Sequence, residues 1–238
     1  MTTIAKILIS ILLALFISSC SFNTGSGVGG NGIVTKDTRN TPEKFTIIST
    51  TEGLNVYITQ ANVTSIHVEA DENIIDFIKT DIKNGKLSIH TSENIGFATK
   101  KIHVTLPLIT ELKSSSGANV IVKNVIETNK IALNASSGSN IKLEITAHEI
   151  KAKSSSGANI RISGNTNNLF TNASSGSNIK AKKLITKTCN AAASSGSGIS
   201  LNVSEDLRAN AYSGGAISYT GNADVEKNKS VSGSITKS

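Results

Sequence analysis

Apolar and polar residues alternate in short runs through the second half of the chain. After Asn140, the aliphatic residues Ile141, Leu143 and Ile145 alternate with Lys142 and Glu144. The same alternation returns at Ile160–Ile162, Ile179–Ala181 and Ile199–Val203. A period of two places every second side chain on one face of the backbone. Each run therefore predicts a strand with one buried face and one exposed face.

A Ser-rich corner precedes each of these runs and recurs along the chain. Its full form reads Ser-Ser-Gly, then Ala or Ser, then Asn and an aliphatic residue, and degenerate copies follow. The corner glycines are Gly117, Gly138, Gly157, Gly176, Gly196, Gly214 and Gly233, spaced 18 to 21 residues apart. This period is short for helical repeats and fits one coil of a β-solenoid. The sequence predicts an all-β parallel solenoid of about seven coils over residues 108–238, a rod about 30 Å long.

Equivalent positions in successive coils carry similar residues. Three residues after the corner glycine stand Val120, Ile141, Ile160, Ile179 and Ile199. Seven residues before it stand Ile131, Ile150, Leu169, Cys189 and Leu207. Stacking of the coils would bring each set together as a buried column. By this reasoning Cys189 is a small buried hydrophobic residue rather than a nucleophile.

The corner also carries an Asn two residues after its glycine in four copies. These residues are Asn119, Asn140, Asn159 and Asn178. Glycine suits a sharp turn because it reaches positive φ without a Cβ clash. Stacked amides can hydrogen-bond from one coil to the next, so the four Asn residues predict a structural polar ladder. The alternative is that an exposed Ser and Asn array binds a glycan or an ion.

Residues 43–107 show strand-like runs without the repeat. The expected strands lie at Phe45–Ile48, Leu54–Ile58, Ser65–Val68 and Lys101–Val104. Asn84-Gly85, between Ile82 and Leu87, is the signal of a two-residue hairpin. Periodicity leaves open whether Ile74–Ile82 is helix or strand. We expect this β-rich segment to cap the open end of the solenoid, because an uncapped edge invites aggregation.

The N-terminus has the features of an export signal followed by a lipid attachment site. Residues 1–19 combine Lys6 with an apolar run from Ile7 to Ile17, which is too short for a stable membrane span. Ile17-Ser18-Ser19-Cys20 resembles the lipobox of bacterial lipoproteins. The resemblance implies cleavage before Cys20 and lipidation of that residue, with residues 20–42 as a Gly/Ser-rich tether. The alternative is a plain signal peptide with an incidental Cys.

Composition and charge exclude several classes of protein. The 238 residues include 24 basic and 17 acidic side chains, two cysteines, and only 4% aromatic residues. Two cysteines cannot form a disulfide scaffold. The net charge of +7 is mild and spread along the coils. Nucleic-acid binding usually combines clustered Lys and Arg with stacking aromatic residues, so we expect no nucleic-acid partner. Attraction to anionic envelope polymers stays open.

The sequence offers little that suggests catalysis or metal binding. The histidines His67, His90, His103 and His148 are widely separated, with no metal-ligand spacing. Glu144, Glu149 and Glu205 fall at unrelated phases of the repeat, and no two acidic residues are expected to stack in adjacent coils. No Gly-x-Ser-x-Gly elbow with partner residues can be assembled. We therefore expect no enzyme activity, no cofactor and no metal.

Taken together, these features resemble the family called putative auto-transporter adhesin, head GIN domain, which is common in lipoproteins of Bacteroidetes. The resemblance covers roughly residues 43–235. It is carried by Val56–Gln60, Ile66–Ala70, Asn73–Leu87 with its Asn-Gly turn, Leu106-Pro107-Leu108 leading into Leu112, and the Ser-Gly-x-Asn corners. It implies a right-handed parallel β-helix without an established activity.

These observations lead to two functional expectations. The first is a non-enzymatic cell-envelope lipoprotein whose β-solenoid is a structural or adhesin-like binding module, with a glycan or protein of the envelope as partner. The second is a carbohydrate-binding or carbohydrate-processing β-helix protein. The residues after Cys20 lack an acidic run resembling the surface-export signal of Bacteroidetes lipoproteins. We therefore expect attachment to the outer membrane on its periplasmic side, with surface exposure as the alternative.

Overall fold

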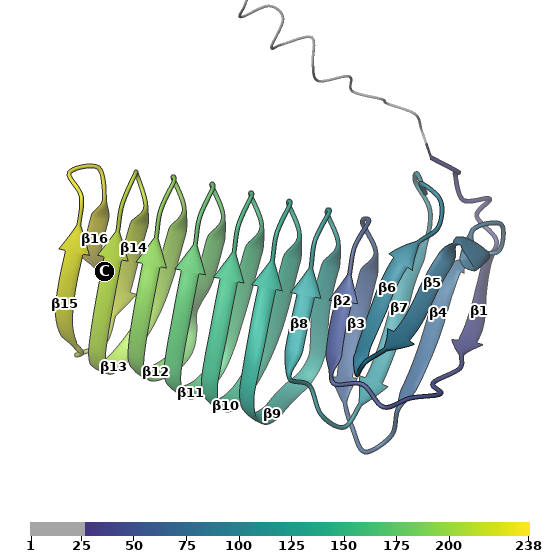
Figure 1. The fold of residues 1–238 in the computed structure, drawn as a ribbon, viewed down its shortest axis with the longest axis horizontal. Coiled ribbons are helices and arrows are strands. Elements are labelled where there is room, and N and C mark those ends of the chain that lie inside the picture. Colours follow the sequence, from purple (N-terminus) through teal and green to yellow (C-terminus); the bar gives the residue numbers. More distant parts are fainter. Residues whose placement is uncertain (1–26) are drawn as a thin grey trace, which may run out of the picture.

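The computed structural model describes residues 27–238, which form a two-sided β-solenoid (Figure 1). The strands are β1 (Val34–Arg39), β2 (Ile47–Thr50), β3 (Asn55–Gln60), β4 (Ser65–Asp71), β5 (Ile78–Lys83), β6 (Lys86–Thr91), β7 (Lys100–Leu106), β8 (Glu111–Ser114), β9 (Asn119–Ala135), β10 (Asn140–Ser154), β11 (Asn159–Ala173), β12 (Asn178–Ala193), β13 (Gly198–Ala211), β14 (Ala216–Thr220), β15 (Asp224–Lys229) and β16 (Ser234–Lys237). The expected solenoid is confirmed. Within residues 27–238 no helix has the length and apolar character needed to cross a bilayer.

Each regular coil is one long strand that bends once and ends in a tight corner. In the coils that begin with β9 to β13, the chain leaves a corner along one face, bends, and returns along the other face to the next corner. We call the residues after each corner the outgoing face and the residues before it the return face. Figure 1 shows the corners as a row along one side of the rod. The arrowheads of the return-face strands point toward them.

Parallel pairing aligns equivalent side chains of successive coils. Ile141 pairs with Ile160, Ile160 with Ile179, and Ile179 with Ile199. On the other side of the core, Cys189 lies between Leu169 and Leu207, as expected, and is 5% exposed. The core is therefore a set of aliphatic columns that run along the axis. Aliphatic side chains supply nearly all of these columns, which is why the coils contain so few aromatic residues.

The corners from Gly117 to Gly214 are tight turns with two residues of positive φ. In the first regular corner, Ser116 has φ 50° and Gly117 has φ 74°, and Ala118 N–H donates to Ser115 O at 3.1 Å. The left-handed conformation costs a non-glycine residue about 1–2 kcal/mol. The Gly117 N–H donates to the carbonyl oxygen of Ser137 in the next coil at 3.0 Å. Stacking of the corners thus provides a hydrogen bond for a group that would otherwise face solvent.

A second layer of hydrogen bonds lies under the corners, where Ser and Ala alternate. In some coils the corner carries a buried Ser and the strand before it ends in Ala, as in Ser177 and Ala173. In others the strand ends in a buried Ser and the corner carries Ala, as in Ser154 and Ala158. Ser177 Oγ donates to Ser154 O at 2.7 Å, and Ser154 Oγ donates to Ala158 O at 3.0 Å. One hydroxyl per coil fits this narrow space.

The N-terminal segment contributes a coil of its own. β2 pairs with both β6 and β8, and β3 pairs with both β7 and β9, so the β2–β3 coil lies between two coils that follow it in sequence. Its corner has the same conformation as the others, with φ 61° at Glu52 and 66° at Gly53. The link from β7 to β8 must therefore pass this inserted coil. The sequence repeat did not reveal this arrangement.

The end of the solenoid beyond this coil is closed by antiparallel strands. β4 pairs with β7 and β1 pairs with β4 on the outgoing face, while β5 pairs with β6 on the return face. The predicted hairpin turn is confirmed, with φ 53° at Asn84 and 72° at Gly85. The segment left open, Ile74–Ile82, contains a short 3-10 turn at Ile75–Phe77 followed by β5.

Candidate functional site

The predicted lipid attachment site lies outside the described residues. Residues 1–19 and Cys20 belong to the part of the chain that the structure does not describe. The expected flexible tether over residues 20–42 needs a correction for its later part. Val28 N–H donates to Asn94 O at 2.8 Å, and Val34–Arg39 forms β1 against β4. Backbone pairing therefore holds this segment against the end of the solenoid.

The four Asn residues of the predicted ladder lie in one row of the outgoing face, and a fifth joins them. Asn119 Nδ2 donates to Asn55 Oδ1 at 3.1 Å, and Asn140 Nδ2 donates to Asn119 Oδ1 at 2.9 Å. Asn178 Nδ2 donates to Asn159 Oδ1 at 3.3 Å. Asn159 Nδ2 instead donates to Gly157 O at 3.4 Å, so no amide bond joins the two halves of the row.

The sequence analysis missed Asn55, although a signal for it was present. Gly53-Leu54-Asn55-Val56 has the same Gly-x-Asn-aliphatic order as the regular corners. Its first residues are Thr51-Glu52, whereas the regular corners begin with a Ser-Ser pair. The amides of the row bind one another and nearby backbone, which leaves them a structural role.

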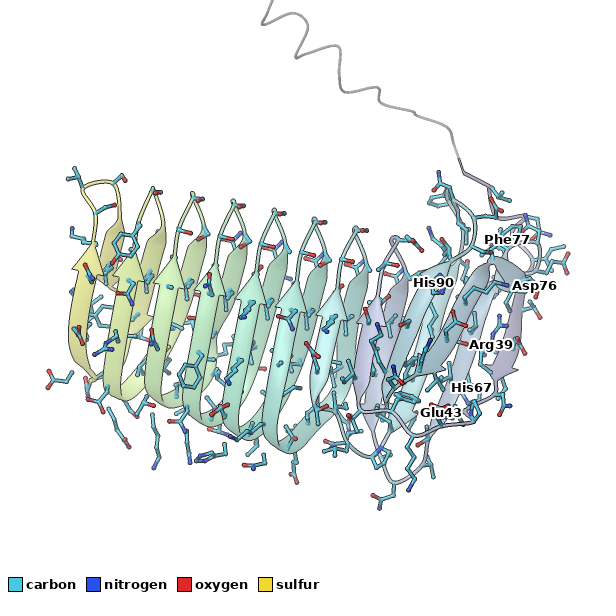
Figure 2. All side chains as sticks on the ribbon, viewed as in Figure 1. Arg39, Glu43, His67, Asp76, Phe77 and His90 are labelled. Atoms are coloured by element: carbon cyan, nitrogen blue, oxygen red, sulfur yellow. The ribbon has the colours of Figure 1, made fainter. Side chains whose placement is uncertain are left out.

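The antiparallel pairing at the N-terminal end brings two histidines together. His67 and His103 are cross-strand partners, although the sequence separates them widely. His103 stacks on Tyr57 with ring centroids 5.2 Å apart, and His67 Nδ1 lies 3.0 Å from Thr38 Oγ1. Burial lowers the pKa of His103, with the nearby Glu69 carboxylate opposing that shift. Figure 2 places His67 at the capped end, away from the repeated coils.

The remaining titratable candidates also have structural surroundings. His90 Nε2 lies 2.7 Å from Asp81 Oδ2 on the β5–β6 hairpin, and Asn167 Nδ2 lies 3.1 Å from His148 Nδ1. Burial raises the pKa of the Cys189 thiol to about 12. A thiol with that pKa stays protonated at neutral pH and is a poor nucleophile. Over residues 27–238, no three His, Cys, Asp or Glu residues gather as a metal site.

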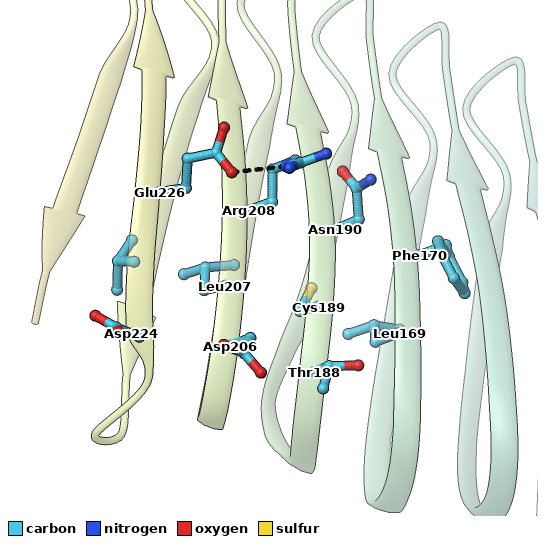
Figure 3. Close-up of a pocket in the computed structure, with 11 residues that line it drawn as sticks. Leu169, Phe170, Thr188, Cys189, Asn190, Asp206, Leu207, Arg208, Asp224 and Glu226 are labelled. Atoms are coloured by element: carbon cyan, nitrogen blue, oxygen red, sulfur yellow. Dashed lines mark hydrogen bonds and ion pairs between the residues drawn. The ribbon is translucent and has the colours of Figure 1, made fainter.

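A shallow groove on the return face contains two acidic residues that the sequence analysis did not expect to stack. Asp206 and Asp224 are paired in adjacent coils, against the expectation that no two acidic residues stack. The groove has a volume of about 580 Å³ and is shown in Figure 3. Arg208 Nε lies 2.9 Å from Glu226 Oε2 along its side. The wrong register has a physical cause. Gly233 N–H donates to Ser230 O as Gly215 N–H donates to Tyr212 O, so Gly233 corresponds to Gly215 rather than to Gly214 and the last coil is shifted by one residue.

A larger groove, which we call the outgoing groove, contains most of the exposed cations of the outgoing face. Its volume is about 680 Å³. Its charged lining residues are Lys123, Lys142, Glu144, Arg161, Lys180, Lys182 and Lys183. Lys142 pairs with Arg161 and Arg161 with Lys180, so three cations stand in register on successive coils. Strands of a sheet are about 4.8 Å apart, and like charges directly opposite one another are destabilising.

Two bulged strands frame the outgoing groove. The register of β9 against β10 shifts between Lys142 and Glu144, where β9 carries extra residues including Lys123. The register of β11 against β12 shifts between Arg161 and Ser163, where β12 carries an extra residue next to Lys182. Bulges bend a strand and change the direction of its side chains, and they are common beside functional sites. Here they place lysines on both sides of the shorter coils that begin with β10 and β11.

The two faces differ in how their cations are balanced. On the return face, Lys151 Nζ lies 3.4 Å from Glu149 Oε1, and Lys130 Nζ lies 3.8 Å from Oε2 of the same carboxylate. Arg208 pairs with Glu226 on the same face. In the described part of the chain, no ion pair involves any cation of the outgoing groove. The positive charge of the groove is therefore left for solvent ions or a ligand. Lys142, Arg161 and Lys180 each follow an Ile of the predicted column, so the repeat already indicated this row, and the structure adds that it lacks ion-pair partners.

The comparison with protein families decides the relationship of this chain. The family described as "Putative auto-transporter adhesin, head GIN domain" matches residues 44–223. The chain belongs to this family. The resemblance seen in the sequence is thereby confirmed for this head GIN domain protein. No curated protein matches the chain.

Several solved structures share the fold of this head GIN domain protein. A "putative adhesin" from Bacteroides fragilis is 18% identical, with a TM-score of 0.80 over 89% of this chain and 100% of that one. A "putative lipid binding protein" from Parabacteroides distasonis is 22% identical, with a TM-score of 0.72 over 89% and 99%. A "putative adhesin" from Parabacteroides merdae is 18% identical, with a TM-score of 0.73 over 89% and 98%. At these identities the likeness concerns the fold.

Proposed function

We propose that this chain is a non-enzymatic binding module of the cell envelope. A lipid on Cys20 attaches it to the outer membrane on the periplasmic side, and the solenoid presents the outgoing groove to a partner. The family description and the adhesin-like relatives support an envelope-associated binding role. The lipobox-like Ile17-Ser18-Ser19-Cys20 supports the attachment.

The observation that carries the binding role is the row of unpaired cations Lys142, Arg161 and Lys180. These side chains are exposed and in register, and each lies beside another positive charge. Such a row costs folding free energy unless counter-charges are provided. On the return face of these coils, Lys151 pairs with Glu149 and Lys187 with Glu205. An external anion would supply the balance that the outgoing face lacks.

The rigidity of the rod supports the same role. Buried corner hydroxyls and the amides of the Asn row form hydrogen bonds between coils, for example from Ser177 to Ser154 and from Asn140 to Asn119. A surface whose backbone is fixed by such bonds loses little conformational entropy when a ligand binds. The outgoing groove is therefore preorganised.

Two sets of measurements test this proposal, one for the attachment and one for the binding role. The first compares the chain with its Cys20→Ser variant by cell fractionation, and we expect the variant to move from the membrane fraction to the soluble fraction. Unchanged membrane retention would contradict the lipid attachment. Protease treatment of intact cells should leave the domain in place, and its removal would move the proposed location to the cell surface.

The second measurement tests the binding role. The Cys20→Ser chain is sedimented with envelope fragments of cells that lack this gene. We expect it to bind, and we expect a triple variant, Lys142→Gln with Arg161→Gln and Lys180→Gln, to stay in the supernatant. Equal sedimentation of the two chains would refute a role for the outgoing groove.

Carbohydrate processing is a second candidate function, and the return face favours it. Asp206 and Asp224 stand in register in the groove of Figure 3, and glycoside hydrolysis uses a pair of carboxyl groups. Both side chains are exposed, whereas a general acid usually needs burial that raises its pKa. Release of reducing ends from envelope polysaccharide, abolished by Asp206→Asn, would establish this function. Absence of release would exclude it.

A further inference from the structure

We infer that the outgoing groove binds a linear polysaccharide that carries carboxylate groups, with the polymer lying along the axis of the solenoid. This inference rests on the binding role proposed above and names the class of ligand. It is carried by the direction of the groove, the sequence of charges along it and the chemistry of its lining.

The direction of the groove matches an extended polymer. Its lining includes Lys123 of β9, Lys142 of β10, Arg161 of β11, Lys180 of β12 and Ser200 of β13, so it crosses five consecutive coils. Four strand spacings amount to about 19 Å. A ligand that lies along the axis would meet a cation on each of the first four coils. A compact anion would contact only one or two of them.

The lining between the cations suits sugar units. Ser163 and Ser200 provide two hydroxyl groups that can hydrogen-bond sugar hydroxyls. The Asn124 amide bonds the N–H and the carbonyl of Gln60 and has a second N–H to donate. Val122 and the exposed Val125 provide apolar contact for the C–H faces of the rings. Glu144 is the one carboxylate in the lining, and it lies outside the row of Lys142, Arg161 and Lys180. The groove thus combines point charges with neutral polar and apolar contacts.

Other anionic macromolecules fit the groove less well. Proteins that bind single-stranded nucleic acid without sequence preference stack bases on aromatic side chains, and the lining of this groove has none. A membrane surface is broad, whereas the cations of this groove follow a single line of successive coils. This arrangement favours one linear chain that crosses the strands.

The experiment measures binding of the full chain, purified in a nonionic detergent, to polygalacturonate by isothermal titration calorimetry. Methyl-esterified polygalacturonate is the matched neutral polymer. The triple variant K142Q, R161Q and K180Q removes the row while keeping side chains of similar length. The matched control, K151Q, K153Q and R208Q, removes two lysines and one arginine from the return face. Near-UV circular dichroism checks that all chains have the same fold.

We expect the acidic polymer to bind and the esterified polymer not to bind. The row variant should bind about tenfold more weakly or worse, and the control variant within about twofold of the original chain. Affinity should fall with salt, and the slope of log affinity against log salt should drop by about one to two in the row variant. Equal losses in both triple variants would overturn the inference, because they would indicate nonspecific attraction.

The remaining outcomes also decide the question. Tighter binding to single-stranded DNA or to vesicles containing anionic lipid than to polygalacturonate would overturn the inference in favour of that class. If the acidic polymer does not bind while envelope sedimentation still depends on the row, the ligand class is wrong and the binding role survives. If sedimentation is independent of the row, the binding role fails and the inference falls with it.

Discussion

The Ser139 hydroxyl donates a hydrogen bond of 2.7 Å to the carbonyl oxygen of Ser114 in the preceding coil. Ser139 is fully buried beneath its corner, and its Oγ also accepts from Ser136 N–H at 3.2 Å. One small side chain thus connects two coils and closes its own turn. The same geometry recurs at Ser177 and Ser197, which makes these hydroxyls a repeated part of the stacking.

Replacement of Ser139 by Ala should therefore destabilise the solenoid. The change removes the hydroxyl bonds to the Ser114 carbonyl and the Ser136 N–H, which stay bonded to each other at 3.0 Å, and a net hydrogen bond contributes about 0.5–1.5 kcal/mol. Urea denaturation should show that loss of unfolding free energy. Ser137→Ala in the same corner is the control, since Ser137 is exposed. A loss in the control equal to that in Ser139→Ala would contradict the role of the buried hydroxyl.

The corner glycines allow the cost of backbone conformation to be separated from that of steric clash. At Gly157, φ is 73° and an added Cβ would meet nothing within 4 Å, so Gly157→Ala should cost about 1–2 kcal/mol from strain alone. At Gly164 an added Cβ would clash with Ile145 O as well. Gly164→Ala should therefore lower the melting temperature clearly more than Gly157→Ala. Equal shifts in thermal unfolding would refute the clash.

Relief of charge repulsion should raise the stability of the fold, in contrast to the substitutions above. Arg161 lies between Lys142 and Lys180, and like charges opposite one another cost about 0.2–1 kcal/mol per pair. Arg161→Gln should stabilise the fold by about 1 kcal/mol in dilute buffer. The gain should shrink in 0.5 M NaCl, because the Debye length falls to a few Å (about 3 Å at 1 M). A destabilised variant at low salt would show that the row is not strained by its charges.

The two cysteines allow a test of burial by thiol chemistry. In the Cys20→Ser chain, Cys189 is the remaining thiol, and burial raises its pKa to about 12. Iodoacetamide at pH 8 should leave the folded chain unmodified and alkylate it in guanidinium chloride. Rapid alkylation of the folded chain would show that the Leu169–Cys189–Leu207 column opens easily.

The same pKa predicts how stability changes with pH. The folded value lies above the ordinary 9.0, so the proton is held more tightly in the folded state. This contribution is complete below pH 9.0 and is lost as the pH rises toward about 12. Cys189→Ala should flatten the decline of unfolding free energy in that range. If the unfolding free energy of the variant declines as steeply as before, other titrating groups cause the decline.

The strands of the capped end show where local sequence suffices and where it does not. The hairpin at Asn84-Gly85 was predicted because an Asn-Gly pair favours two residues of positive φ. The position of the β2–β3 coil between later coils could not be predicted, since pairing partners at long sequence separation leave no local signal. The proximity of His67 and His103 has the same origin, because β4 and β7 pair across an antiparallel end.

The sequence by itself determined the coils of this protein. Alternation along each strand and a glycine at each corner act locally, and they predict strands, turns and the buried columns through Ile141 and Ile150. Only the tertiary structure decided which side chains meet between coils. A bulge in β9 or β12, or the one-residue shift at the last corner, changes which side chains of two adjacent coils are paired beyond that point. For that reason the pair of Asp206 and Asp224 emerged only from the register of the sheet. The row of Lys142, Arg161 and Lys180 follows from the repeat, and the structure decided which neighbours surround it.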